Sequence, residues 1–217
     1  MMRPRHRQFG SERVPAPRRA GGLRAGAAPS TPSAVEHRQP GPGADNSALG
    51  QLASLFANEP ELIRAFFESS DPSAPADDER ALTAAFEAAA ANPDYADLHY
   101  FTAWAALRLG KLSEAEVLLQ HALELNPHYI DALILAAKVA QASNDPNHAI
   151  TLLNRAIAAG ADYADVYVML ASQLHACGEA GRARQSYTRS LELNPTLAEA
   201  RTGLASLATS GPSGGAR

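Results

Sequence analysis

The residues best equipped for covalent chemistry are Cys177 and His175, because a thiol and an imidazole can act together as nucleophile and base. Residues two apart on a helix point to different sides, however, so this pair is not expected to meet. The sequence also has no glycine-rich phosphate loop, no Gly-x-Ser-x-Gly turn and no His-Glu-x-x-His motif. We therefore predict that the protein is not an enzyme.

Metal and cofactor sites are not expected either. Cys177 is the only cysteine of the chain, so neither an intramolecular disulfide nor a cysteine-rich zinc cluster can form. His121 and His128 stand on the two sides of a predicted helix end and are expected to face solvent. We predict no metal and no cofactor.

The composition indicates a soluble protein with one medium-sized folded unit. Of the 217 residues, 46% are hydrophobic, but no apolar run approaches the roughly 20 residues that a membrane helix requires. Residues 1–47 contain eight arginines and three acidic residues, whereas the rest of the chain contains eleven Lys or Arg and twenty acidic residues. Membrane insertion is therefore not expected, and the acidic body argues against nucleic acid as the partner.

The first 47 residues form a basic tail that is rich in Arg, Pro and Gly. With almost no large apolar residues, such a segment cannot bury enough surface to offset the roughly 1–2 kcal/mol per residue lost on ordering a backbone. We expect it to be disordered, as a solvated tail or an overextended start of translation, and a transit peptide or nucleic-acid arm stays open. Residues 209–217 are also expected to be disordered. The expected location is cytoplasmic, with organelle targeting by the tail left open.

Between residues 81 and 207 the sequence repeats with a period of 34 residues. Small residues recur at this interval in three columns, which are Ala81, Ala115, Ala149 and Ala183; Ala103, Ala137, Ala171 and Ala205; and Ala88, Ala122, Ala156 and Ser190. An acidic column at the same interval consists of Asp97, Asp131, Asp165 and Glu199. An aromatic or apolar column lies two residues before it and consists of Tyr95, Tyr129, Tyr163 and Leu197. Several independent columns with one period indicate a repeated structural unit.

Each period is typical of two antiparallel helices joined by a short turn. Apolar residues recur at helical spacing on both sides of Gly110, and the equivalent turn positions hold Asn144 and Gly178. These residue types tolerate the left-handed conformation that often ends a helix.

Caps are predicted at the start of the second helices. Ser113 stands three residues before Glu116, which is the spacing of a capping box. Asp145 followed by Pro146 supplies a cap and a first-turn proline.

A helix-turn-helix unit of 34 residues with these columns resembles the tetratricopeptide repeat. Residues 96–129, 130–163 and 164–197 match it as three full repeats. The family pattern expects small residues at the eighth, twentieth and twenty-seventh positions and proline near the thirty-second; the first repeat supplies Ala103, Ala115, Ala122 and Pro127. The sequence departs from the pattern at the fourth position, where the usual tryptophan is replaced by His99, Leu133 and Tyr167.

The resemblance implies an all-α protein, a right-handed α-solenoid of antiparallel helix pairs. Residues 48–95 would form degenerate N-terminal helices and half a repeat. Residues 96–197 would form the three tetratricopeptide repeats, and residues 198–208 a capping helix.

In tetratricopeptide proteins the first helix of each pair lines the concave side, where the second, fifth, ninth and twelfth positions face a groove. Carried over position by position, with Arg108 added beside the only tryptophan, the predicted partner-binding residues are Asp97, Tyr100, Trp104, Leu107, Arg108, Asp131, Ile134, Lys138, Gln141, Asp165, Val168, Ser172 and His175. The resemblance therefore implies a non-catalytic protein–protein interaction scaffold that binds a peptide or protein segment in this groove.

Some of these residues also have a purely structural interpretation. Tyr100 and Trp104 either anchor a partner or pack beneath the irregular N-terminal helices. The acidic column either selects a basic peptide or reflects the roughly 0.3–1 kcal/mol by which a helix dipole stabilises first-turn carboxylates. The clamp that some family members use for the carboxylate tails of chaperones is absent, because Tyr100, Trp104 and Leu135 replace its Lys and Asn residues.

A second functional interpretation is a structural or self-assembling subunit of a larger complex. In that case exposed apolar residues of the N-terminal helices, around Phe56, Phe66 and Phe67, would pair copies of the chain or dock onto another protein. The sequence leaves the oligomeric state and the identity of the partner open.

Overall fold

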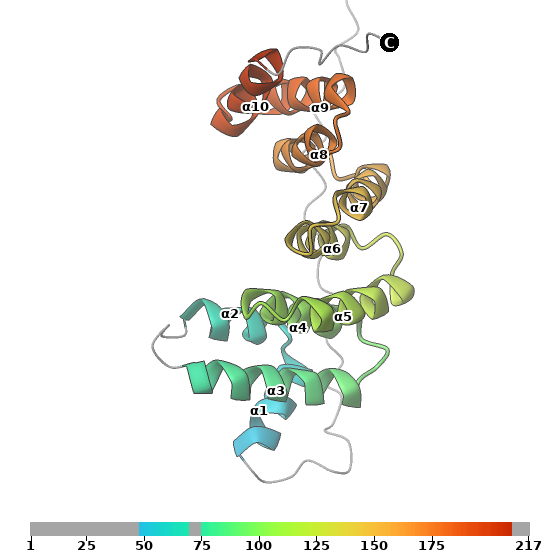
Figure 1. The fold of residues 1–217 in the computed structure, drawn as a ribbon. Helices are drawn as coiled ribbons and strands as arrows, with labels where there is room; N and C mark the ends of the chain where they lie inside the picture. Colours follow the sequence, from blue (N-terminus) through green and yellow to red (C-terminus); the bar gives the residue numbers. More distant parts are fainter. Residues whose placement is uncertain (1–47, 70–74, 210–217) are drawn as a thin grey trace, which may run out of the picture. The chain divides into compact units, whose positions relative to one another are not determined.

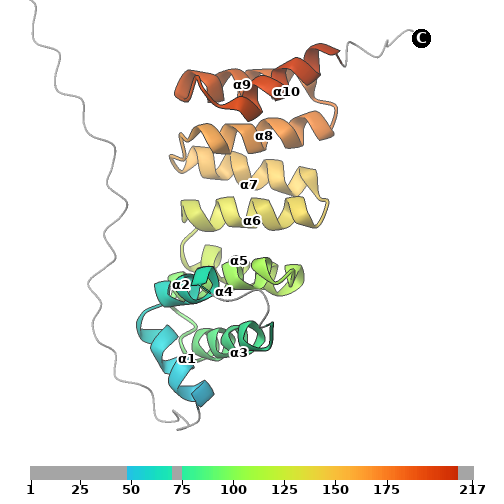
Figure 2. The ribbon, with the colours of Figure 1, turned by 90° about the vertical axis from the view of Figure 1, so that its left-hand side faces the viewer.

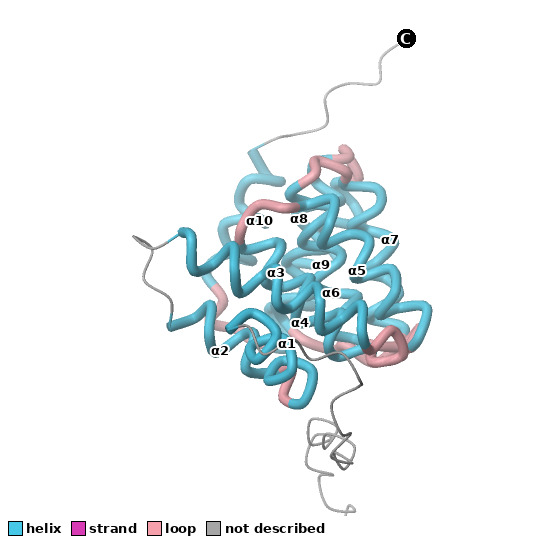
Figure 3. The backbone as a smooth tube through the Cα atoms, turned by 90° about the horizontal axis from the view of Figure 1, so that it is seen from below, coloured by secondary structure: helices cyan, strands magenta, loops and turns pink. Residues whose placement is uncertain are grey.

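The computed structural model describes residues 48–69 and 75–209, and this part of the chain contains ten helices and no strand (Figures 1 and 3). In chain order the helices are α1 (Ala48–Asn58), α2 (Glu61–Ser69), α3 (Pro75–Ala91), α4 (Ala96–Arg108), α5 (Leu112–Leu125), α6 (Ile130–Ala142), α7 (Pro146–Ala158), α8 (Ala164–Ala176), α9 (Ala180–Leu193) and α10 (Ala198–Thr209). The tails predicted to be disordered lie outside the described residues, except that Thr209 ends α10. None of the described helices is both long and apolar enough to cross a membrane.

Successive helices pack as pairs, and the pairs stack. Within the pairs α4 contacts α5, α6 contacts α7 and α8 contacts α9, while α5 contacts α6 and α7 contacts α8 from one pair to the next. Figure 2 shows α6, α7 and α8 lying one after another in this stack. First helices also meet directly, because α4 contacts α6 and α8 contacts α10. The fold is the α-solenoid of antiparallel helix pairs that the repeat predicts.

Small side chains lie where the helices meet. The column that begins at Ala81 is fully buried, and so are Ala103, Ala137 and Ala171. Because alanine extends no further than Cβ, it lets two backbones approach at the packing density of a protein interior. Ala205, the last member of its column, is exposed, since no described helix covers that side of α10.

The turns inside the pairs adopt the predicted left-handed backbone. Gly110, Asn144 and Gly178 have φ angles of 74°, 58° and 78°. Gly160, which follows α7, has a φ of 108°. Glycine therefore follows the second helix of this repeat, where the first and third repeats have Asn126-Pro127 and Asn194-Pro195.

One predicted helix cap is confirmed and the other is wrong. The Asp145 carboxylate accepts a hydrogen bond of 3.0 Å from the backbone amide of His148, and Pro146 begins α7. The capping box of Ser113 and Glu116 does not form, because α5 begins at Leu112 with Lys111 as its N-cap. The left-handed turn closes so tightly that the Lys111 amide already bonds to the Ala106 carbonyl at 2.9 Å, which places Ser113 inside the helix.

The N-terminal helices bury their own aromatic residues. Phe56 and Phe67 are 1% and 0% exposed, and Phe66 makes edge-to-face contacts with both, at centroid distances of 6.4 and 5.5 Å. The reason is that α1 packs against α3 and α2 packs against α3 and α4. The prediction of an exposed apolar docking surface at these phenylalanines is therefore wrong.

Candidate functional site

The predicted groove residues lie on α4, α6 and α8, which are the first helices of the three repeats. None of them is buried. Five are exposed, namely Arg108, Asp131, Lys138, Gln141 and Asp165, and the others are half-buried. All of them are therefore open to contact with another molecule, at least in part.

An aromatic cluster lies at the α4 end of this surface. The Tyr129 phenol donates a hydrogen bond of 2.6 Å to Oδ1 of Asp97, and its ring centroid lies 5.3 Å from that of Tyr100. Burial, followed by this hydrogen bond, raises the pKa of Tyr129 well above its usual range. Burial, followed by the charge of Asp131, also raises the pKa of Tyr100. Both phenols are thus held in the neutral form, and Tyr129 was not among the predicted residues.

Trp104 is flanked by two arginines of its own chain. The guanidinium carbons of Arg64 and Arg108 each lie 5.8 Å from the Trp104 ring. Arg64 belongs to α2, where it also donates a 2.8 Å bond to Glu68. The α2 helix packs against α4, so part of the space beside Trp104 is filled by the N-terminal helices. This agrees with the structural interpretation of Trp104, although the side chain stays half-buried rather than enclosed.

The acidic column is not uniform. Asp97, Asp131 and Asp165 all lie in the first turn of their helices. Asp97 holds the Tyr129 phenol, whereas the exposed Asp131 and Asp165 form no ion pair within the part of the chain that the structure describes. Lys138, also exposed, has no ion-pair partner there either. The charges of α6 and α8 are therefore uncommitted.

Apolar and neutral polar residues accompany these charges on α6 and α8. Ile134 and Val168 are half-buried apolar residues beside these charges. The Ser172 hydroxyl is already used, because it donates a 2.8 Å bond to the Met169 carbonyl of its own helix. His175, in the last turn of α8, is half-buried.

The geometry around the single cysteine does not form a nucleophile and a base. Cys177 is the C-cap of α8, and its thiol lies 3.7 Å from Oδ1 of Asn147. Within the described ranges, no three His, Cys, Asp or Glu side chains are grouped so that they could hold a metal ion.

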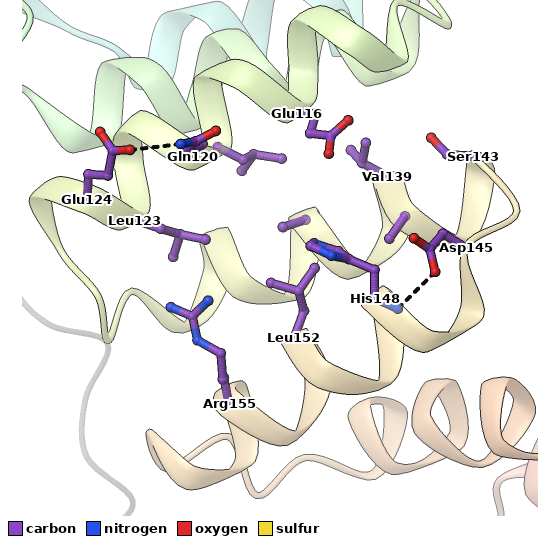
Figure 4. A pocket seen from close by; sticks show the side chains of 13 residues that line it. Glu116, Gln120, Leu123, Glu124, Val139, Ser143, Asp145, His148, Leu152 and Arg155 are labelled. Atoms are coloured by element: carbon purple, nitrogen blue, oxygen red, sulfur yellow. Dashed lines mark hydrogen bonds between the residues drawn. The ribbon is translucent and has the colours of Figure 1, made fainter.

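A cavity of about 580 Å³ lies away from the predicted groove. It is lined by α5, α6 and α7, between the second helices of the first two repeats (Figure 4). None of the predicted partner-binding residues lines it.

Comparison with known proteins identifies the repeat. Two models of the tetratricopeptide repeat match residues 106–174 and 164–197. The chain is a tetratricopeptide repeat protein. No curated protein sequence matches it.

Solved structures share the fold of this tetratricopeptide repeat protein. MamA from Desulfovibrio magneticus RS-1 is 18% identical with a TM-score of 0.63, over 75% of this chain and 87% of that one. A thermophilic tetratricopeptide protein of Thermus thermophilus is 20% identical with a TM-score of 0.52, over 74% and 81%. The first such domain of Spaghetti (RPAP3), bound to the HSP90 peptide SRMEEVD, is also 20% identical with a TM-score of 0.52, over 55% and 94%. At these identities the likeness establishes the fold.

Proposed function

We propose that this tetratricopeptide repeat protein is a non-catalytic scaffold that binds a peptide or protein segment along α4, α6 and α8. The observation that supports it is the set of exposed charges on neighbouring first helices, Asp131, Lys138 and Asp165, which have no ion-pair partner among the described residues. Charges that are not used inside a chain are available to select a partner and to speed its encounter.

The two ends of the surface would contribute differently. At α4, Arg64 and Arg108 already flank Trp104, and Asp97 already holds Tyr129. We expect a partner to contact this end by packing on the outer edge of the aromatic cluster. At α6 and α8 the apolar Ile134 and Val168 lie beside free charges, which combines an apolar contact with polar selection.

The peptide in the RPAP3 structure supports a peptide as the occupant of such a surface. The chemistry of recognition would differ here from the chaperone-tail clamp. Leu135, at one of the positions that the clamp needs for asparagine, is apolar and only 5% exposed. We therefore propose a partner segment that is selected by side-chain charges rather than by its terminal carboxylate.

The same proposal includes the division of the chain. Residues 48–95 would be a degenerate repeat that closes one end, residues 96–197 the partner-binding repeats and residues 198–208 the closing helix at the other end.

The test is affinity purification of partners, with identification by mass spectrometry, using the wild-type chain and two charge variants. Lys138→Glu, on the proposed surface, should abolish capture of the partner. Arg184→Glu, at an exposed position of α9, changes the charge by the same amount; it is the matched control and should leave capture intact. Trp104→Ala, at the α4 end of the surface, should weaken capture of the partner.

Far-UV circular dichroism should show the same helical signal in all variants, because the substituted residues are not buried. Equal capture by the Lys138→Glu and Arg184→Glu variants, both folded, would overturn the proposed surface.

A further inference from the structure

The cavity between α5 and α7 is a groove with an apolar floor. Leu119 and Leu123 of α5, Val139 and Ala140 of α6 and Leu152 of α7 line it. Figure 4 shows Leu123, Val139 and Leu152 among the side chains that line it.

Glutamates stand on the α5 wall, whereas the α7 wall carries Arg155 and, at its N-cap, Asp145. The glutamates are Glu116 and Glu124 (Figure 4). Glu124 accepts a bond from Gln120 of its own helix. Neither Glu116 nor Arg155 has an ion-pair partner in the described ranges, and no ion pair crosses the groove. The groove therefore separates charges that would attract each other if the walls closed.

The next repeat shows that the stack itself does not require the Glu116 carboxylate. One period after Glu116 stands Ile150, which is buried in the apolar core. Glu116 therefore leaves open a site between the helices that the apolar side chain of Ile150 fills in the following repeat.

Arg155 lacks the acidic partners that Arg189, its equivalent in the next repeat, has. One period later, Arg189 bonds to both oxygens of Asp162, at 3.1 and 2.9 Å, and to Glu192 at 3.0 Å. One period before these two acids stand His128 and Ala158, which carry no carboxylate. Arg155 is therefore free at a position where the following repeat uses arginine to fasten a loop.

We propose that the α5–α7 groove docks an amphipathic helix of another protein. Its apolar stripe lies on the floor between the two walls, its Lys or Arg residues face Glu116 and Glu124, and its acidic flank faces Arg155. This site differs from the proposed surface on α4, α6 and α8, because it lies between second helices.

The helical walls of the groove favour a helix over a strand as the occupant. Glu116 and Glu124 are eight residues apart, which is about 12 Å or slightly more than two helical turns. A docked helix presents residues at i, i+4 and i+7 over the same length. A strand would need unpaired backbone groups at the edge of a sheet, and the backbone groups along α5 and α7 are engaged in helices.

The test uses the full chain and two stapled helical peptides of roughly 18 residues with the same leucine stripe. The first carries Lys on one flank and Glu on the other, and the second carries Glu on both flanks. Fluorescence anisotropy should show that the wild-type chain binds the first peptide at least about tenfold more tightly than the second.

Charge reversal supplies the decisive variant. The pair Glu116→Lys and Glu124→Lys should reverse this preference, so that the peptide with two acidic flanks binds more tightly. The matched control pair, Glu87→Lys and Glu114→Lys, changes the charge by the same amount at exposed positions that do not line the groove, and should keep the wild-type preference.

A second variant tests the other wall. Arg155→Glu should weaken binding of the first peptide about tenfold by leaving its acidic flank without a partner. Lys138→Glu, on α6 and outside the groove lining, should leave binding of both peptides unchanged, which separates this inference from the proposed function. Circular dichroism should confirm that each variant is folded.

Three results would overturn the inference. The first is that the two peptides fail to bind or bind equally well. The second is that the control pair also reverses the peptide preference. The third is that light scattering shows a wild-type dimer that the Glu116→Lys and Glu124→Lys pair dissociates. The last result would mean that a second copy of the chain occupies the groove.

Discussion

The phenol of Tyr129 donates a 2.6 Å hydrogen bond to Asp97, and this bond links the N-cap of α6 to the first turn of α4. Tyr163, the equivalent tyrosine one period later, is 55% exposed. The backbone differs as well, because ψ is 94° at Tyr129 and 137° at Tyr163, which follows the glycine break of Gly160. The tyrosine column of the repeat therefore forms a hydrogen bond between α4 and α6 through Tyr129, whereas Tyr163 before α8 stays exposed.

Tyr129→Phe should lower the free energy of unfolding by about 1–2 kcal/mol, because it leaves a half-buried carboxylate without its donor. Urea denaturation followed by circular dichroism measures the change. Tyr163→Phe is the matched control, and it should change the free energy of unfolding by less than about 0.5 kcal/mol. Equal losses in the two variants would show that the bond to Asp97 contributes nothing.

The same tyrosine predicts a loss of stability in alkali. Burial and the bond to Asp97 raise the pKa of Tyr129 above its usual value of 10.0. The unfolded chain therefore releases this proton near pH 10 while the folded chain keeps it. The contribution of Tyr129 to the free energy of unfolding is fully present below pH 10 and is lost as the pH rises further. Between about pH 8 and 11, the free energy of unfolding should fall more steeply in the wild type than in Tyr129→Phe.

Other tyrosines do not confuse this comparison. Burial also raises the pKa of Tyr100 and Tyr187, which gives the same sign of pH dependence, but both remain in the wild type and the variant. The difference between the two proteins therefore belongs to Tyr129. Parallel pH profiles would contradict the assigned cause.

The repeat period predicted the helix pairs because each pair buries its small residues against the next one, and that requirement leaves the same mark every 34 residues. The error at Ser113 arose where a local motif was preferred to the period. Asp145 caps α7, and one period before it stands Lys111, which is the N-cap of α5. Register therefore decided where the helix begins, although Lys111 provides no side-chain cap.

The surface was less accessible to sequence reasoning than the fold. Family positions placed Lys138 and Asp165 on the surface of first helices, but they could not place Arg64 over Trp104. That contact depends on the docking of α2 on α4, and these two segments are not related by the repeat. The free Arg155 could have been found in the sequence by comparing it with Arg189 and asking which repeat keeps the acidic partners.

Asp145→Ala should lower the free energy of unfolding by about 1 kcal/mol, because it removes the side chain that accepts the amide hydrogen of His148. Ser113→Ala should have almost no effect, since Ser113 lies inside α5 and caps nothing. Urea denaturation of both variants makes the comparison. If Ser113→Ala lowered the free energy of unfolding as much as Asp145→Ala does, Ser113 would act as a cap, contrary to the structure.

Ser190→Ala should stabilise the protein by about 1 kcal/mol. The Ser190 side chain is fully buried, and its hydroxyl has no hydrogen-bond partner in the described part of the chain, so its desolvation is not compensated. The equivalent positions one and two periods earlier hold the buried alanines Ala156 and Ala122. Ser186→Ala, at a half-buried position one turn earlier, is the control for helix propensity. A lower thermal midpoint for Ser190→Ala than for the wild type would reveal a missed partner.

Gly203→Ala should destabilise the last helix by about 1–3 kcal/mol. Gly203 of α10 lies against the ring of Tyr187 of α9, and an added Cβ would overlap the ring carbons Cζ, Cε1 and Cε2. The ring is 5% exposed and cannot swing away without leaving its buried site, so the clash outweighs the roughly 0.5–1 kcal/mol that alanine gains over glycine in a helix.

Gly181→Ala on α9 isolates that gain, because its Cβ would meet nothing within 4 Å. This control should be as stable as the wild type or more stable. Hydrogen exchange should show faster exchange of the α10 amides in Gly203→Ala and unchanged exchange in α4 to α7, since each pair contacts only its neighbours. Unchanged protection of α10 would mean that the two helices can separate slightly without cost, and that the close approach of Gly203 to Tyr187 is not required.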